Sequence, residues 1–186
     1  MNFLHRRLCR SSRWKNRLEK DLLPWVLENV DLGRNALEIG PGPGLTTDVL
    51  RNRVQHLTCI EVDSAYAGAL ARRLSESNVT VLCEDATKMS LTDGGFDAAV
   101  SLTMLHHVPS PALQDRLFAE VARVLRPGGI FAGVDSVYNT GLRLFHLFDT
   151  FVPIDPATLR PRLEAAGFSG IRIDVDRHAF RFRAHR

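Results

Sequence analysis

Two periodicities of the hydrophobic positions divide most of the chain into short strands and amphipathic helices. Short apolar runs, typical of buried strands, occur at residues 35–40, 56–62, 78–85, 96–102, 129–136, 169–175 and 178–185. Between them, apolar residues recur every three or four positions and predict helices at residues 45–53, 64–77, 110–126 and 155–168. Strands that alternate with helices favour a parallel sheet covered by helices on both faces. We therefore predict a three-layer α/β/α fold.

The last two strands differ from the others because only about two residues separate them. This distance is too short for a crossover connection, so the two strands must form an antiparallel hairpin. In the final strand, Phe180 and Phe182 alternate with Arg181 and Arg183. Such alternation suits a strand near the sheet edge with one solvated face.

An N-terminal arm, residues 1–31, precedes the first strand. Its apolar residues recur every four positions from Leu18 to Val30, which predicts an amphipathic helix over residues 14–30. Pro24 must kink or divide this helix, because proline lacks the backbone N–H that a helix interior needs.

Residues 136–155 separate the fifth strand from the next helix, and their apolar positions follow helical spacing. These positions are Leu142, Phe145, Phe148 and Phe151. Such a face could roof a binding site as a substrate-side lid or could pack on the core, and the spacing fits both. The polar residues here that could contact a substrate are Asp135, Tyr138, His146 and Asp149.

Size and composition indicate one globular domain over residues 1–186. Hydrophobic residues make up 45% and charged residues 24% of the chain, which is ordinary for such a domain. No apolar run reaches the roughly 18 residues of a membrane span. The three cysteines form no CxxC pair, and the N-terminus lacks the apolar core of a signal peptide. We therefore expect a reduced, cytoplasmic protein.

The net charge of +3 conceals two basic ends. Residues 1–20 carry seven Lys or Arg and one acid, and residues 172–186 carry five Arg and two Asp. A basic arm can bind nucleic acid or an anionic membrane surface. It can equally be a solvated helix face and a charged edge strand.

A glycine-rich turn follows the first strand, in the sequence LEIGPGPGL. Gly40, Gly42 and Gly44 let the backbone turn sharply and approach a ligand closely. A nicotinamide site would require the spacing G-x-G-x-x-G, but Leu45 stands where that pattern continues, and no Lys-Ser/Thr pair marks a triphosphate loop. Glu38, just before the turn, would repel a pyrophosphate and favour a cationic group.

Acidic residues also end the next two strands. Glu61 lies 21 residues after Gly40, at the position where an acid can accept hydrogen bonds from both ribose hydroxyls. Asp63 is a second candidate for that role, or a cap for the following helix. Asp85 can accept from an adenine amine, and the Ala86 amide can donate to a ring nitrogen. Together these groups indicate a nucleoside ligand with a cationic amino-acid end.

Five motifs in order, LEIGPGPG, IEVD, CEDAT, FDAAVSLTMLHHV and VLRPGGIF, resemble those of class I S-adenosylmethionine-dependent methyltransferases, of the type 11-like group. The resemblance covers roughly residues 35–135. It implies a Rossmann-like, seven-stranded sheet of order 3-2-1-4-5-7-6 with the seventh strand antiparallel. It also implies S-adenosylmethionine as cofactor and S-adenosylhomocysteine as product. The residues expected to contact this cofactor are Glu38, Gly40, Pro41, Gly42, Gly44, Glu61, Val62, Asp85, Ala86 and Leu102.

Two adjacent histidines follow the fourth strand, at the edge of the sheet where the cofactor is expected. His106 or His107 could act as a general base, since histidine titrates near neutral pH. Alternatively, both could cap or pack the start of a helix. We expect no metal site, because adjacent side chains should point apart and no Cys/His/Asp cluster shows ligand spacing.

The predicted activity is methyl transfer to a small-molecule or lipid-like acceptor by in-line displacement. Ribosomal RNA adenine dimethyltransferases have a similar first half, but Ser101-Leu102-Thr103-Met104 replaces their Asn-Leu-Pro-Tyr tetrad. An RNA or protein acceptor that uses the basic ends is the first alternative. A cofactor-binding module without catalytic activity is the second.

Overall fold

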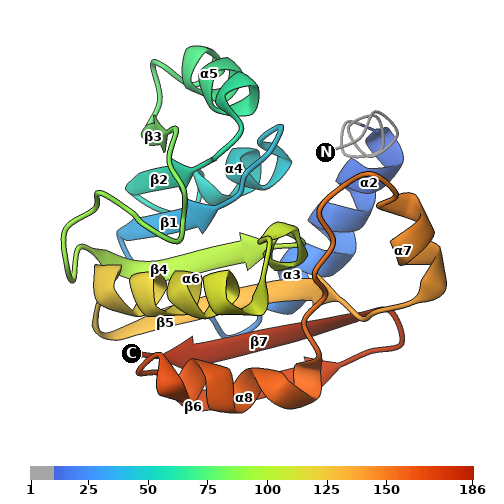
Figure 1. The fold of residues 1–186 in the computed structure, drawn as a ribbon. Coiled ribbons are helices and arrows are strands. Elements are labelled where there is room, and N and C mark those ends of the chain that lie inside the picture. The colour runs from blue at the N-terminus through green and yellow to red at the C-terminus, as the bar shows by residue number, and fades with distance from the viewer. Residues whose placement is uncertain (1–10) are drawn as a thin grey trace.

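A seven-stranded sheet forms the centre of the structure, a computed structural model that describes residues 11–186 (Figure 1). The strands are β1 (Asn35–Ile39), β2 (His56–Ile60), β3 (Val79–Leu82), β4 (Phe96–Leu102), β5 (Leu125–Ser136), β6 (Ser169–Val175) and β7 (Ala179–His185). Their order is β3-β2-β1-β4-β5-β7-β6. The first five strands pair in parallel, and β7 pairs antiparallel with both β5 and β6. The predicted fold class, sheet order and hairpin are therefore confirmed.

Helices cover both faces of this sheet. They are α2 (Ser12–Arg17), the π-helical η1 (Leu18–Leu22), α3 (Leu23–Val26), α4 (Leu45–Leu50), α5 (Ser64–Arg73), the 3-10 helix η2 (Leu105–His107), α6 (Pro111–Val124), α7 (Thr140–Phe145) and α8 (Pro156–Ala165). Helices α6 and α8 lie on one face, and the N-terminal helices lie behind the sheet with α4 (Figure 1). None of the helices in residues 11–186 is both long and apolar enough to cross a bilayer.

The core has two apolar layers because side chains alternate along each strand. In β1, Leu37 and Ile39 pack with α6 and α8, whereas Ala36 packs with the N-terminal helices. Because β1 to β5 run parallel, their carboxyl ends share one edge of the sheet, where the predicted ligand residues lie.

The N-terminal helix runs through Pro24 with a π-helical turn and without a division, and it ends earlier than the predicted residue 30. The backbone widens into the π-helical η1 just before the proline, where the Leu23 N–H donates to the Leu18 carbonyl. Pro24 then occupies the first turn of α3, where its missing N–H costs nothing. Helix α3 ends at Val26, so Val30 lies outside it. Residues 1–10 of the predicted arm lie outside the described residues.

Other predicted boundaries also differ from the structure, and two of these differences have a clear physical reason. The helix expected to continue to Arg126 ends at Val124, because Leu125 already pairs with Phe96 in the sheet and Pro127 disfavours a helical Arg126. The helical spacing from Leu142 to Phe151 yields only the short α7. After α7 the chain turns, with Phe148 at φ +65° and 99% exposed.

Candidate functional site

A cavity of about 660 Å³ opens at the carboxyl ends of β1, β2 and β4. Eight of the predicted cofactor residues line it: Gly40, Pro41, Gly42, Glu61, Val62, Asp85, Ala86 and Leu102. Four of the other predicted site residues line it too: His106, His107, His146 and Asp149. Glu38, Gly44, Asp135 and Tyr138 are not part of the wall. The structure therefore brings twelve of the sixteen predicted residues to one cavity.

The glycine turn adopts a backbone that favours glycine at three positions. Gly40, Gly42 and Gly44 have φ angles of +68°, +54° and +84°. A Cβ at Gly40 would lie 2.2 Å from Met104 Cγ, whereas a Cβ at Gly42 would meet nothing within 4 Å. The turn is therefore packed against the protein at Gly40 and open to the cavity at Gly42.

Glu61 connects the first two strand ends. Its Oε2 accepts from the Gly42 N–H at 2.9 Å, and its Oε1 accepts from the Asp63 N–H at 2.9 Å. Each carboxylate oxygen offers two lone pairs, so both can also accept from a ligand hydroxyl. Asp63 caps α5 by accepting from the Ala65 N–H at 3.0 Å, which is the alternative role that the sequence suggested.

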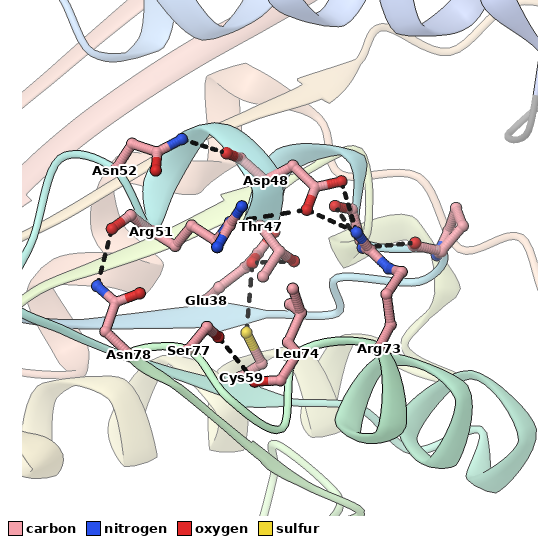
Figure 2. A network of polar contacts seen from close by, with 12 residues as sticks. Glu38, Thr47, Asp48, Arg51, Asn52, Cys59, Arg73, Leu74, Ser77 and Asn78 are labelled. Carbon is pink, nitrogen blue, oxygen red and sulfur yellow. Dashed lines mark hydrogen bonds and ion pairs between the residues drawn. The ribbon is translucent and has the colours of Figure 1, made fainter.

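Glu38 lies beneath the turn rather than in the cavity wall. Figure 2 shows it between Thr47 of α4 and Cys59 of β2. The Glu38 carboxylate accepts from the hydroxyls of Thr46 and Thr47, the latter at 2.6 Å, and from the Cys59 thiol at 3.4 Å. Burial raises the pKa of Glu38, and burial together with the Glu38 charge raises the pKa of the Cys59 thiol. Glu38 thus anchors α4 to the sheet, and its contact with a ligand stays a prediction.

An ion pair also supports the turn from α5. Arg73 Nη1 lies 2.7 Å from Asp48 Oδ1, and Arg73 Nη2 donates to the Gly44 carbonyl at 3.3 Å (Figure 2). Asp48 belongs to α4, so the turn and two helices are joined. The backbone that faces the cavity is therefore held from behind.

Asp85 and Ala86 lie at the rim, beyond the end of β3. Asp85 is exposed, and its Oδ1 accepts from the Thr87 N–H at 2.8 Å. Ala86 is half-buried. Both residues face the same cavity as Glu61, which suits the predicted adenine contacts.

Three imidazoles meet at the other end of the cavity. His106 and His107 lie in η2, and His146 follows α7. The ring centroids are 4.3 Å apart for His106 and His107, 5.1 Å for His106 and His146, and 5.3 Å for His107 and His146. The expectation that the adjacent histidines point apart is therefore wrong. In a 3-10 helix successive side chains are turned by only about 120°, so neighbouring rings can lie on the same side.

Asp135 fixes the orientation of His106 from beneath. It is buried in β5, and its Oδ1 lies 2.5 Å from His106 Nδ1, while its Oδ2 accepts from the His106 N–H at 3.1 Å. A carboxylate beside Nδ1 assigns the proton to that nitrogen, which leaves the lone pair on Nε2. Asp135, predicted as a substrate contact, instead orients a histidine of the wall.

Backbone carbonyls of residues 136–155 orient the other two rings. His107 Nδ1 lies 3.1 Å from the Thr150 carbonyl oxygen, and His146 Nδ1 lies 2.7 Å from that of Leu142. Burial lowers the pKa of His146, so its neutral form is favoured. Phe151 stacks on His146 at 4.5 Å, and Tyr138 stacks on the far side against Phe151 at 6.3 Å.

The remaining wall is mostly apolar and includes Leu142 and Phe145 of the predicted roof. It also includes residues that the sequence did not assign to the site, which are Trp14, Leu18 and Leu22 of the N-terminal helices and Met104. The four-residue spacing of the first three marked a helix face, but no local signal showed that this face reaches the cavity.

Comparison with known proteins gives three findings. A family model described as a methyltransferase domain matches residues 37–133. A ubiquinone biosynthesis O-methyltransferase of Methylococcus capsulatus is 31% identical over 100 residues, which are 52% of this chain and 41% of the relative. The ribosomal RNA small subunit methyltransferase A of Fusobacterium nucleatum is 33% identical over 94 residues, 49% of this chain and 35% of the relative. The chain thus spans less than half the length of these curated relatives.

Solved structures share the fold over nearly the whole chain. A SAM-dependent methyltransferase from Aquifex aeolicus superposes with a TM-score of 0.71 at 23% identity, covering 91% of this chain and 92% of that one. Another from Archaeoglobus fulgidus gives a TM-score of 0.75 at 17% identity, covering 99% of each chain.

Proposed function

The chain belongs to the methyltransferase domain family, and from that premise we propose that it transfers a methyl group from S-adenosylmethionine to a hydroxyl group of a small or lipid-like acceptor. One observation carries this proposal. A single cavity joins the glycine turn and Glu61 at one end to an imidazole cluster with apolar walls at the other. The family and its S-adenosylmethionine-dependent class confirm the resemblance found in the sequence.

The cofactor occupies the end formed by β1, β2 and β3. Glu61 accepts from the ribose hydroxyls, and the open side of the turn at Gly42 admits the amino-acid end. Asp85 and the Ala86 amide bind the adenine at the rim. Leu102, at the end of β4, would line the cavity beside the place where the cofactor end meets the acceptor end.

The acceptor occupies the end formed by the N-terminal helices, η2 and residues 136–155, which act as the lid. Trp14, Leu18, Leu142 and Phe145 give this end an apolar wall, which favours a small or partly apolar acceptor over a folded polymer. The O-methyltransferases among the relatives support an oxygen acceptor.

The chain has to orient the acceptor and remove its proton. When bound, S-adenosylmethionine supplies an electrophilic methyl group on a sulfonium that leaves without assistance. Alignment inside a closed cavity can contribute about 7–11 kcal/mol at best. As the C–O bond forms and the C–S bond breaks, the hydroxyl proton must pass to another group. The imidazoles of His106 and His107 are the nearest candidate bases, and Asp135 holds His106 with its Nε2 lone pair available for that proton.

The test is methyl tracing in a cell extract. Purified protein receives methyl-labelled S-adenosylmethionine with the extract, and small molecules and lipids are separated from RNA and protein. Gly42→Arg is the control, because its side chain must enter the open cavity, and its Cβ meets no other atom within 4 Å although the backbone is strained at φ +54°.

Label above the control in the small-molecule or lipid fraction is the expected result. Label in RNA would overturn the proposed acceptor class and favour the activity that the Fusobacterium nucleatum relative's name describes. No label in any fraction, with S-adenosylhomocysteine still bound, would favour a binding module without catalytic activity.

A further inference from the structure

We propose that His106, His107 and His146 bind a divalent transition-metal ion, with zinc as the representative case, at the acceptor end of the cavity. One ring nitrogen from each histidine takes part in a group whose atoms all lie within 4.8 Å of one another. Two come from η2 and the third from the end of α7, so the site joins the sheet edge to the lid.

The hydrogen bonds of the three rings follow the pattern of metal-bound histidines. Each Nδ1 lies against an oxygen: Asp135 Oδ1 at 2.5 Å, the Thr150 carbonyl at 3.1 Å and the Leu142 carbonyl at 2.7 Å. These partners place the proton on Nδ1 and the lone pair on Nε2 in all three rings. A metal-ligating histidine almost always donates its other ring N–H to a carboxylate or backbone carbonyl in this way.

The donor set also suits a catalytic type of site. Imidazole nitrogens favour zinc, copper, iron and nickel over magnesium or calcium. Three protein ligands leave a fourth position open, as in catalytic zinc sites. Because all three histidines line the cavity, this fourth position borders the space where the acceptor is proposed to bind.

Packing of the aromatic rings does not by itself explain why the ring nitrogens of the three histidines converge. Phe151 stacks on His146 with an interplanar angle of 18°, and stacking covers a ring face but not the nitrogens at its edge. Zinc–nitrogen bonds of about 2.0–2.1 Å bring ligand atoms to roughly 3.4 Å from one another. Metal binding therefore draws His146 and the short α7 toward η2 and closes the lid.

Only the role of the ion rests on the proposed methyl transfer. There, the ion would occupy the Nε2 lone pairs, so in place of an imidazole base it would act as a Lewis acid on the acceptor oxygen and lower the pKa of its hydroxyl. The site itself is tested without cofactor or acceptor, so the failure of one proposal leaves the other standing.

The experiment is a cobalt titration of the full chain without an affinity tag, after dialysis against a chelator. We expect one equivalent of Co²⁺ to produce the visible absorption of a tetrahedral site, and Zn²⁺ to displace it. His107→Ala and His146→Ala should each weaken Co²⁺ binding at least tenfold. His56→Ala, which removes an exposed histidine outside the cluster, should bind as the wild type does.

His146→Phe separates ligation from packing. Phenylalanine keeps an aromatic ring against Phe151 but offers no nitrogen, so this variant should still unfold cooperatively, with only the loss of the hydrogen bond to Leu142, and should lose Co²⁺. His146→Cys should retain binding, since a thiolate can replace an imidazole on zinc or cobalt. The proposal is overturned if the wild type shows no stoichiometric tetrahedral band, if His146→Phe binds Co²⁺ in the same way as the wild type, or if His56→Ala weakens Co²⁺ binding as much as His146→Ala does.

Discussion

The two ends of the cavity are built in different ways. The cofactor end comes from one continuous stretch, residues 38–86, in which each strand end contributes a turn or an acid. The acceptor end combines segments far apart in the sequence, from Trp14 through η2 to His146. The first end is therefore formed by segments that are close in the sequence, whereas the second depends on how distant segments pack.

The supports of the two ends differ as well. Behind the glycine turn, Glu38, Glu61 and Arg73 bond to backbone or to side chains of rigid helices and strands. Two of the three imidazoles instead depend on carbonyls of residues 136–155. Movement of the lid therefore changes the acceptor end while the cofactor end stays fixed.

The largest effect on stability should come from adding a side chain at Gly40 of the glycine turn. In Gly40→Val, a β-branched residue at φ +68° adds about 1–3 kcal/mol of backbone strain. Its Cβ also meets Met104, which adds about 1–3 kcal/mol of overpacking. Chemical unfolding measures the sum. Gly42→Ala is the matched control, with backbone strain but no clash, and equal destabilisation of the two variants would contradict this view of the turn.

An intermediate effect is expected from Asp135→Asn at the acceptor end. The Asp135 carboxylate accepts from His106 Nδ1, from the His106 backbone N–H and from the Ser136 N–H. An amide has a single acceptor oxygen and cannot accept all three bonds, so the free energy of unfolding should fall by about 1–3 kcal/mol. Methyl transfer should fall about 10²-fold, within the range for proton-transfer groups, while S-adenosylhomocysteine affinity stays unchanged.

The control for Asp135→Asn is Asp93→Asn, which replaces an exposed aspartate that pairs with Arg123. Turnover and cofactor affinity are measured on the same preparations. If Asp135→Asn weakened cofactor affinity as much as turnover, the separation of the two ends would be wrong.

The smallest effect concerns the pH dependence of stability at Glu38. Burial raises its pKa in the folded protein, so the folded state binds more protons than the unfolded state above the unfolded pKa. The wild type should therefore lose stability relative to Glu38→Gln as pH rises through this window, by at most about 1.4 kcal/mol per pH unit. Urea unfolding of both proteins from pH 4 upward measures the difference. A difference that does not change with pH would contradict the buried, protonatable state.

The same contrast explains what the sequence could predict. The strands follow from periodicity, and their order follows from the family resemblance that five short motifs carry. The residues expected to contact the cofactor lie in these same motifs. The end of α6 was missed because Leu125 pairs in the sheet with Phe96, which lies about thirty residues earlier in the sequence. The approach of His146 to His106 was missed for a similar reason, since forty residues separate them and no spacing rule connects them. Glu38 was found, but its hydroxyl partners in α4 could only be seen in the fold.

The account is tested most directly by measuring S-adenosylhomocysteine binding calorimetrically in Glu61→Ala and His107→Ala side by side. Loss of the bonds to Glu61 should cost about 1.5–3 kcal/mol, a weakening of roughly 10- to 150-fold. His107→Ala should bind within about twofold of the wild type, because it lies at the acceptor end. Wild-type affinity in Glu61→Ala, or an equal loss in both variants, would contradict a cavity divided into a cofactor end and an acceptor end.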